Sequence, residues 1–159
     1  MHVEDLAPYG PLPPVDERLK AIGWLERGFA YATGRSDPRV VDRLFDFVQA
    51  PWFPRFGSMG YHSCDLCPDA VPKSATVVVW RRHWLARKRR AEVGAINLYV
   101  AGSHCFYIAP SMILHYMLTH HYAPPPEFAH AVLSCPGMET PQYLQAIRDT
   151  GLGYLESTE

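Results

Sequence analysis

Apolar residues along the chain recur with helical or strand spacing, and this pattern predicts the elements of the fold. The first helical pattern covers residues 37–49, with apolar positions at i, i+3, i+4 and i+7: Val41, Leu44, Phe45 and Val48. Asp37 and Pro38 are typical of a helix start, because the carboxylate caps free N–H groups and proline suits the first helical position. The sequence therefore predicts a helix that ends before Pro51.

Three later runs have the composition of strands. Residues 75–80 are mostly β-branched, and residues 94–100 and 104–109 flank a short turn that contains Gly102. Two strands so close in the chain are typical of a hairpin. The sequence therefore predicts a small antiparallel sheet of about three strands.

The second half of the chain contains further helical patterns. A central helix follows Pro110, and Met112, Ile113, Tyr116 and Met117 form its apolar face. Shorter helices are expected over residues 127–133 and 140–149, each bounded by proline or glycine. Residues 16–25 fit a helix, although Gly23 favours an early break. The fold class expected is α+β, with two to four short helices packed on the sheet.

Length and proline content set the expected domain organisation. The chain has 159 residues, enough for one domain with its own core, and 15 prolines, which predict short elements with many turns. We expect residues 1–15 to form an extended proline-rich segment and residues 16–159 to form a single domain.

Charge and hydropathy exclude several classes of protein. The net charge is −1, so no overall field attracts nucleic acid or anionic membrane. No apolar run approaches the roughly 18 residues that cross a bilayer, and the acidic, proline-rich start is unlike a signal peptide. We therefore expect a cytoplasmic protein without membrane contact, whose thiols stay reduced.

Cysteine and histidine have metal-ligand spacing at the two ends of residues 61–122. Cys64 and Cys67 form a Cys-x-x-Cys pair, and His115 with His120 forms His-x4-His. Zinc commonly takes two thiolates from such a turn and two imidazoles from the end of a helix. We expect these four residues to bind one structural Zn²⁺ in a zinc-finger-like site. The 47 residues between Cys67 and His115 place it within a larger domain than a small finger.

Other assignments of these residues remain open. His121 fits the spacing as His-x5-His, and His62 could replace one histidine, although we favour His120. Residues five apart on a helix point about 140° apart, so the last turn must tighten or unwind. The cysteine pair could instead be inert, form a disulfide or act in redox chemistry. Cys105 and Cys135 are expected to be small buried side chains.

Several short strings resemble an uncharacterised family of small bacterial proteins. They are Gly60 to Cys67, Ile113 to His120 and Tyr122 to Pro125 with Phe128, which match a G-x-H-x-C-x-x-C and H-Y-x-x-x-H-x-Y-x-P-P pattern. Residues 23–26 and 33–34 resemble its N-terminal signature, so the likeness covers about residues 20–133. It implies that Cys64, Cys67, His115 and His120 are the matched ligands. The family brings no assigned activity, and it lacks the basic insert of residues 81–90.

Three functions follow from these features. The first is a structural zinc domain that binds a protein partner, with an aromatic patch formed by Trp24, Trp52, Phe53 and Phe56. The second is nucleic-acid binding by a basic, tryptophan-flanked segment with the residues Arg81, Arg82, Arg87, Lys88, Arg89 and Arg90. The third is a metal-dependent hydrolase with an open zinc site, in which Asp65 or Asp69 acts as base. No known catalytic motif is present, which favours a role other than catalysis.

Overall fold

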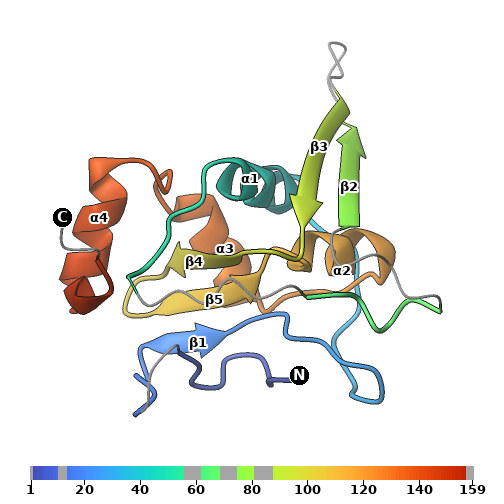
Figure 1. Ribbon diagram of the computed structural model, residues 1–159, viewed down its shortest axis with the longest axis horizontal. Coiled ribbons are helices and arrows are strands. Elements are labelled where there is room, and N and C mark those ends of the chain that lie inside the picture. Colours follow the sequence, from blue (N-terminus) through green and yellow to red (C-terminus); the bar gives the residue numbers. More distant parts are fainter. Residues whose placement is uncertain (1, 11–13, 56–61, 69–74, 81–87, 157–159) are drawn as a thin grey trace.

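A computed structural model describes residues 2–10, 14–55, 62–68, 75–80 and 88–156 of the chain. The helices are α1 (Pro38–Gln49), α2 (Ile113–Thr119), α3 (Pro126–Ser134), α4 (Pro141–Asp149) and the short 3-10 helix η1 (Gly153–Leu155). The strands are β1 (Leu19–Ala21), β2 (Ala75–Trp80), β3 (Lys88–Val93), β4 (Asn97–Ala101) and β5 (Phe106–Pro110). Figure 1 shows their arrangement. The predicted α+β class is confirmed.

The central sheet has three strands in the order β1-β5-β4 and is mixed. β4 and β5 form the predicted antiparallel hairpin, but β1 runs parallel to β5, with Leu19 opposite Phe106. Residues 16–25, which fitted a helix in the sequence, thus contribute a strand. Leu19 and Ala21 are buried on either side of the half-buried Lys20, and Gly23 turns the chain with a φ of 70°.

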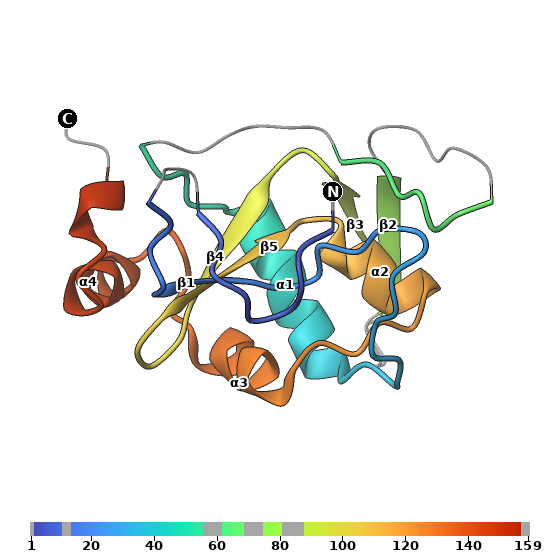
Figure 2. The same cartoon turned by 90° about the horizontal axis from the view of Figure 1, so that it is seen from below.

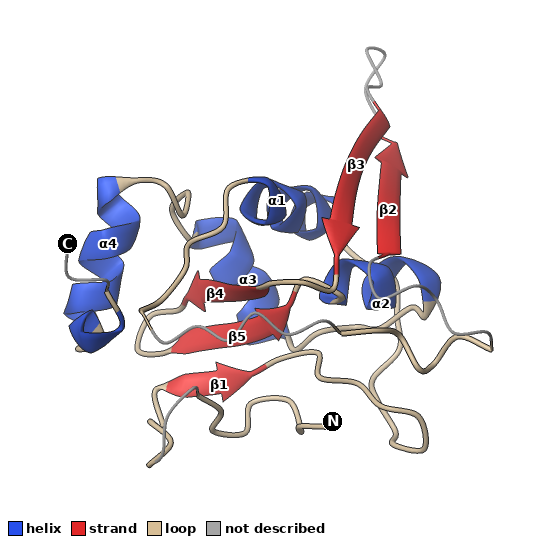
Figure 3. Cartoon of the chain, viewed as in Figure 1, coloured by secondary structure: helices blue, strands red, loops and turns tan. Residues whose placement is uncertain are grey.

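The strand predicted over residues 75–80 belongs to a separate two-stranded ribbon. It pairs antiparallel with β3, from Ala75 opposite Val93 to Trp80 opposite Lys88, and the ribbon stands away from the central sheet (Figure 3). The expectation that residues 75–80 join the same sheet is therefore wrong. Lys88 to Arg90 lie in β3, because cross-strand pairing outweighs their charge.

The helices enclose an apolar core on the sheet. Asp37 caps α1 by accepting a hydrogen bond from the Arg39 N–H, and Thr140 caps α4 in the same way. α1 contacts α2 and α3, whereas α3 and α4 contact β4 (Figure 2). None of the helices within the described ranges is long and apolar enough to cross a bilayer.

The N-terminal residues lie beside β1 and help to position the end of α2. Val3 and Pro8 form isolated bridges with Trp24 and Lys20. The Asp5 carboxylate accepts hydrogen bonds from the Gly23 N–H at 2.8 Å and from the Tyr122 hydroxyl at 2.8 Å. Tyr122 follows α2, so Asp5 connects the first residues of the chain to the segment just beyond that helix.

Candidate metal centre

The structure brings together the four residues that the sequence suggested as metal ligands. One ligand atom from each of Cys64, Cys67, His115 and His120 lies within 4.8 Å of all the others. Cys64 Sγ is 3.2 Å from His120 Nε2, and Cys67 Sγ is 3.3 Å from the same nitrogen and 3.4 Å from His115 Nε2. Four donors so close together could hold one metal ion.

These separations can be compared with a tetrahedral zinc site. Metal–ligand bonds of about 2.3 Å to sulfur and about 2.0 Å to nitrogen imply donor separations of about 3.3–3.8 Å. Three of the four sulfur–nitrogen distances lie within a few tenths of an ångström of that range. Small side-chain rotations would therefore complete a tetrahedron around one ion.

In the turn from Cys64 to Cys67, backbone N–H groups donate hydrogen bonds to the sulfur of Cys64. Cys64 is 1% exposed, and burial raises the pKa of its thiol to about 11. Hydrogen bonds from the backbone N–H groups of Cys67 and Leu66 oppose that shift, because they stabilise the thiolate. A buried thiolate also needs a cation nearby, and a metal ion at this point would supply it.

The end of α2 places the second histidine beside the first. His120 is the C-cap residue, and its φ of −106° and ψ of 6° depart from helical values. His121 adopts a left-handed φ of 55°, and the Tyr122 N–H donates to the Tyr116 carbonyl. The chain thus leaves the helix at His120, which turns that ring toward His115, as the sequence analysis required of the last turn.

Burial favours the neutral form of both histidine rings, which is the form that binds a metal. Burial lowers the pKa of His115, and His120 nearby lowers it further; burial likewise lowers the pKa of His120. The Thr119 hydroxyl lies 3.3 Å from His115 Nδ1. If Nδ1 carries the proton and donates to Thr119, then Nε2 faces the sulfur atoms as a free donor.

Two residues that sequence reasoning missed support the site. Arg27 holds the Cys64–Cys67 turn, because its guanidinium donates to the Cys67 carbonyl at 2.7 Å and its N–H donates to the Asp65 carboxylate at 3.2 Å. Thr119 orients His115 from the next turn of α2. The i, i+4 spacing of His115 and Thr119 was visible in the sequence. In contrast, no local pattern links Arg27 to Asp65 and Cys67, which lie 38 and 40 positions further along the chain.

The alternative ligands lie elsewhere. The His62 ring packs edge-on against Trp24 at 4.8 Å and is not among the four clustered donors. His121 is exposed and borders an open hollow with Thr33 and Arg35. Cys135 is buried, as expected, and Cys105 is half-buried. The structure thus brings His120, rather than His121 or His62, to the cysteine pair.

The basic segment is described only from Lys88 onward, so Arg81, Arg82 and Arg87 lie outside the described residues. Arg89 binds within the molecule, with its guanidinium 2.6 Å from Asp46 Oδ1 and 5.3 Å from the centre of the Phe45 ring. Arg90 is exposed. Nucleic-acid binding by this segment stays a prediction. The Arg89 guanidinium binds Asp46 of α1.

The expected aromatic patch is divided between core and surface. Trp24 is 2% exposed and donates its indole N–H to the Ile108 carbonyl, so it belongs to the core. Trp52 is half-buried against Tyr99 and Tyr143. Phe53 is 51% exposed, and Phe56 lies outside the described residues. Of the residues that the structure describes in this group, only Phe53 is largely exposed.

In a comparison with known proteins, the chain matches a family without an assigned activity. The model of a family described as "Domain of unknown function (DUF7919)" matches residues 1–133, which include the four clustered cysteine and histidine residues. No curated protein and no solved structure matches the chain. The family is thus one of unknown function, as the resemblance implied.

Proposed function

We propose that this chain, which belongs to the DUF7919 family, is a zinc-binding protein whose ion stabilises the fold and supports contact with a protein partner. The observation that carries the proposal is the convergence of Cys64, Cys67, His115 and His120, with all four ligand atoms within 4.8 Å. They come from a loop and from the end of α2, about 50 residues apart in the sequence, so one ion would join two distant segments.

The chemistry of the donors favours zinc. Two thiolates and two imidazoles suit a borderline-soft ion, whereas magnesium and calcium prefer oxygen donors. Zinc also has no geometric preference of its own, and it accepts a tetrahedron of such donors. Copper(I) and iron share part of this preference, so metal analysis must identify the ion.

A structural role follows from the number of protein donors. Four protein ligands fill a tetrahedral ion and leave no position for a reactive water, as in structural zinc sites. Among the described residues, no carboxylate belongs to this cluster of four ligand atoms. Because such ligands are not assembled in an unfolded chain, binding of the ion stabilises the folded state directly.

The partner-binding role rests on exposed aromatic surface. Phe53 is 51% exposed and follows the half-buried Trp52, which packs against Tyr99 and Tyr143. A large aromatic side chain on a firm support is typical of an interaction site.

Free thiols at all four cysteines are consistent with a reducing compartment, and the cytoplasm is such a compartment.

Metal content and unfolding test this proposal together. Purified protein should carry one zinc ion per chain at native mass, and a chelator that removes it should lower the melting temperature. The Cys105→Ser variant is the control, because this half-buried cysteine lies outside the cluster. Absence of bound metal, or an unchanged melting temperature after its removal, would refute the structural role. Cross-linking in the cells from which the protein comes tests for a partner. We expect a protein that is cross-linked to the parent chain and is not cross-linked to the Phe53→Ser variant.

A further inference from the structure

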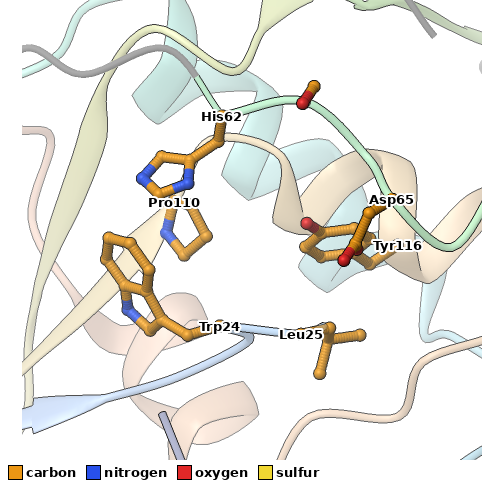
Figure 4. A pocket seen from close by; sticks show the side chains of 7 residues that line it. Trp24, Leu25, His62, Asp65, Pro110 and Tyr116 are labelled. Atoms are coloured by element: carbon orange, nitrogen blue, oxygen red, sulfur yellow. The ribbon is translucent and has the colours of Figure 1, made fainter. Parts of the chain in front are cut away.

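A small polar cavity lies beside the candidate metal centre. Its volume is about 250 Å³, and it is lined by Trp24, Leu25, His62, Ser63, Asp65, Pro110 and Tyr116. Figure 4 labels six of them, which lie around one space and come from the loop after β1, residues 62–65, the end of β5 and α2. A cavity of this size is below the roughly 300 Å³ of drug-sized pockets, so its ligand is a group of few atoms.

Hydrogen-bonding groups in the cavity wall have unused capacity. Within the described part of the chain, no hydrogen bond is made by the His62 ring, the Ser63 hydroxyl or the Tyr116 hydroxyl. Tyr116 is 3% exposed, and Trp24 and Leu25 form an apolar side of the same space. Polar groups that meet in a hollow without protein partners are satisfied by water or by a ligand.

The charge of the cavity comes from Asp65. Its carboxylate accepts one hydrogen bond, from the Arg27 N–H at 3.2 Å, and has no basic side chain within ion-pair distance among the residues that the structure places. The Arg27 guanidinium is directed to the Cys67 carbonyl. An anionic oxygen can accept two or more hydrogen bonds, so Asp65 retains capacity for a cationic donor.

We propose that this cavity is a binding site for a primary ammonium group, held by the Asp65 carboxylate and by the oxygen atoms of Ser63 and Tyr116. An ammonium group presents three N–H donors, and the cavity offers these three oxygens and an imidazole as acceptors. Trp24 and Leu25 contact the carbon atoms next to the nitrogen. The ammonium group belongs either to a small free amine or to a lysine side chain of a polypeptide. The site depends on the position of the cysteine turn but not on the identity of the metal.

Nuclear magnetic resonance of the metal-loaded protein tests the site directly. Ethylammonium chloride is titrated at constant ionic strength while the Trp24 indole N–H and the Tyr116 resonances are followed, with ethanol as a neutral probe and sodium acetate as an anionic one. We expect saturable shifts with ethylammonium in the millimolar range and none with ethanol or acetate. A parallel titration with Nα-acetyl-lysine N-methylamide separates the sources: tighter binding than ethylammonium indicates a lysine side chain, and weaker binding indicates a small amine.

Matched variants locate the charge that carries recognition. Asp65→Asn removes a charge but keeps the shape of the side chain, and Asp149→Asn makes the same change on the exposed face of α4. We expect Asp65→Asn to weaken ethylammonium binding about tenfold and Asp149→Asn to leave it unchanged, because charge-assisted hydrogen bonds are the stronger ones. Metal content is measured on both variants, so loss of the ion is distinguished from loss of the amine. Equal affinity of the two variants, or equal shifts with ethanol and ethylammonium, would overturn the proposal.

Discussion

His115 and His120 are five residues apart at the end of one helix, yet their rings lie 5.1 Å apart between centroids at an interplanar angle of 73°. On a regular helix, residues with this spacing point about 140° apart. The structure removes this conflict at His120, where the backbone leaves the helix with a φ of −106°. The local unwinding of α2 is therefore what makes a two-histidine site available there.

His120 and His121 should differ sharply when each is replaced by asparagine. Asparagine tolerates the left-handed φ of 55° at position 121, so His121→Asn should keep its metal and unfold within about 0.5 kcal/mol of the parent. His120→Asn should lose the metal, because one of four ligands is gone. Metal content and denaturant unfolding of the pair provide the measurement. Retention of a full equivalent of metal by His120→Asn would show that His120 is not a ligand.

Replacement of Cys64 should destabilise the fold itself. Cys64→Ser keeps a similar size but removes a soft ligand, and the remaining donors would lose most of their zinc affinity. We expect the melting temperature to fall to that of the chelator-treated parent, since metal binding and folding are linked. Thermal unfolding by circular dichroism, with and without chelator, measures this. A variant that still responds to chelator as strongly as the parent would contradict the assignment.

Thr119 should tune the metal affinity without being a ligand. Its hydroxyl lies 3.3 Å from His115 Nδ1, and loss of a group that orients a ligand typically costs tenfold to a hundredfold in affinity. Thr119→Val should therefore weaken zinc binding by about tenfold, whereas Thr119→Ser should retain most of it. Competition with a chromophoric chelator gives both affinities. If the valine and serine variants bind zinc equally well, the hydroxyl does not orient the ring.

A separate ion pair predicts how stability responds to acid. Hydrogen bonds from Arg18 lower the pKa of Asp16 from 3.8 to about 2, with a smaller contribution from the Tyr154 hydroxyl. The folded state thus has the lower pKa, so the stabilisation is complete above about pH 4 and is lost as the pH falls toward 2. At pH 6, Asp16→Asn should cost about 1 kcal/mol, because Arg18 is exposed and solvent screens the pair.

The control for Asp16→Asn is Asp149→Asn, which makes the same change at an exposed position of α4. Urea unfolding at pH 6 and pH 3 gives the stability difference between the two variants, in which shared effects such as metal release cancel. This difference should shrink at pH 3. A difference that is constant between the two pH values would mean that Asp16 does not titrate as the ion pair requires.

The site was predictable from the sequence because its ligands follow local spacing rules. Cys64 and Cys67 occupy one turn, and the helix that ends near His120 is marked by its apolar face and by the prolines that follow. The helices α1 and α4 were equally visible, since Asp37 and Thr140 are caps followed by proline. These features act within a few residues of one another, and one sequence suffices to detect them.

The parts that the sequence did not reveal depend on contacts between distant residues. β1 has only three residues, and its strand conformation depends on pairing with β5, more than 80 positions away. Arg89 of β3 forms ion pairs with Asp42 and Asp46 of α1, which lie more than 40 positions earlier in the sequence. Arg27, which holds the cysteine turn, likewise acts across about 40 residues. Such pairings are decided by tertiary packing, which local propensity does not encode.

X-ray absorption at the zinc edge, on protein purified at native mass with its metal, tests the central claim most directly. The proposed site predicts two sulfur neighbours at about 2.3 Å and two imidazole nitrogens at about 2.0 Å. A shell with fewer than two sulfur atoms, or one that includes a bound water in place of an imidazole, would contradict a closed site formed by Cys64, Cys67, His115 and His120.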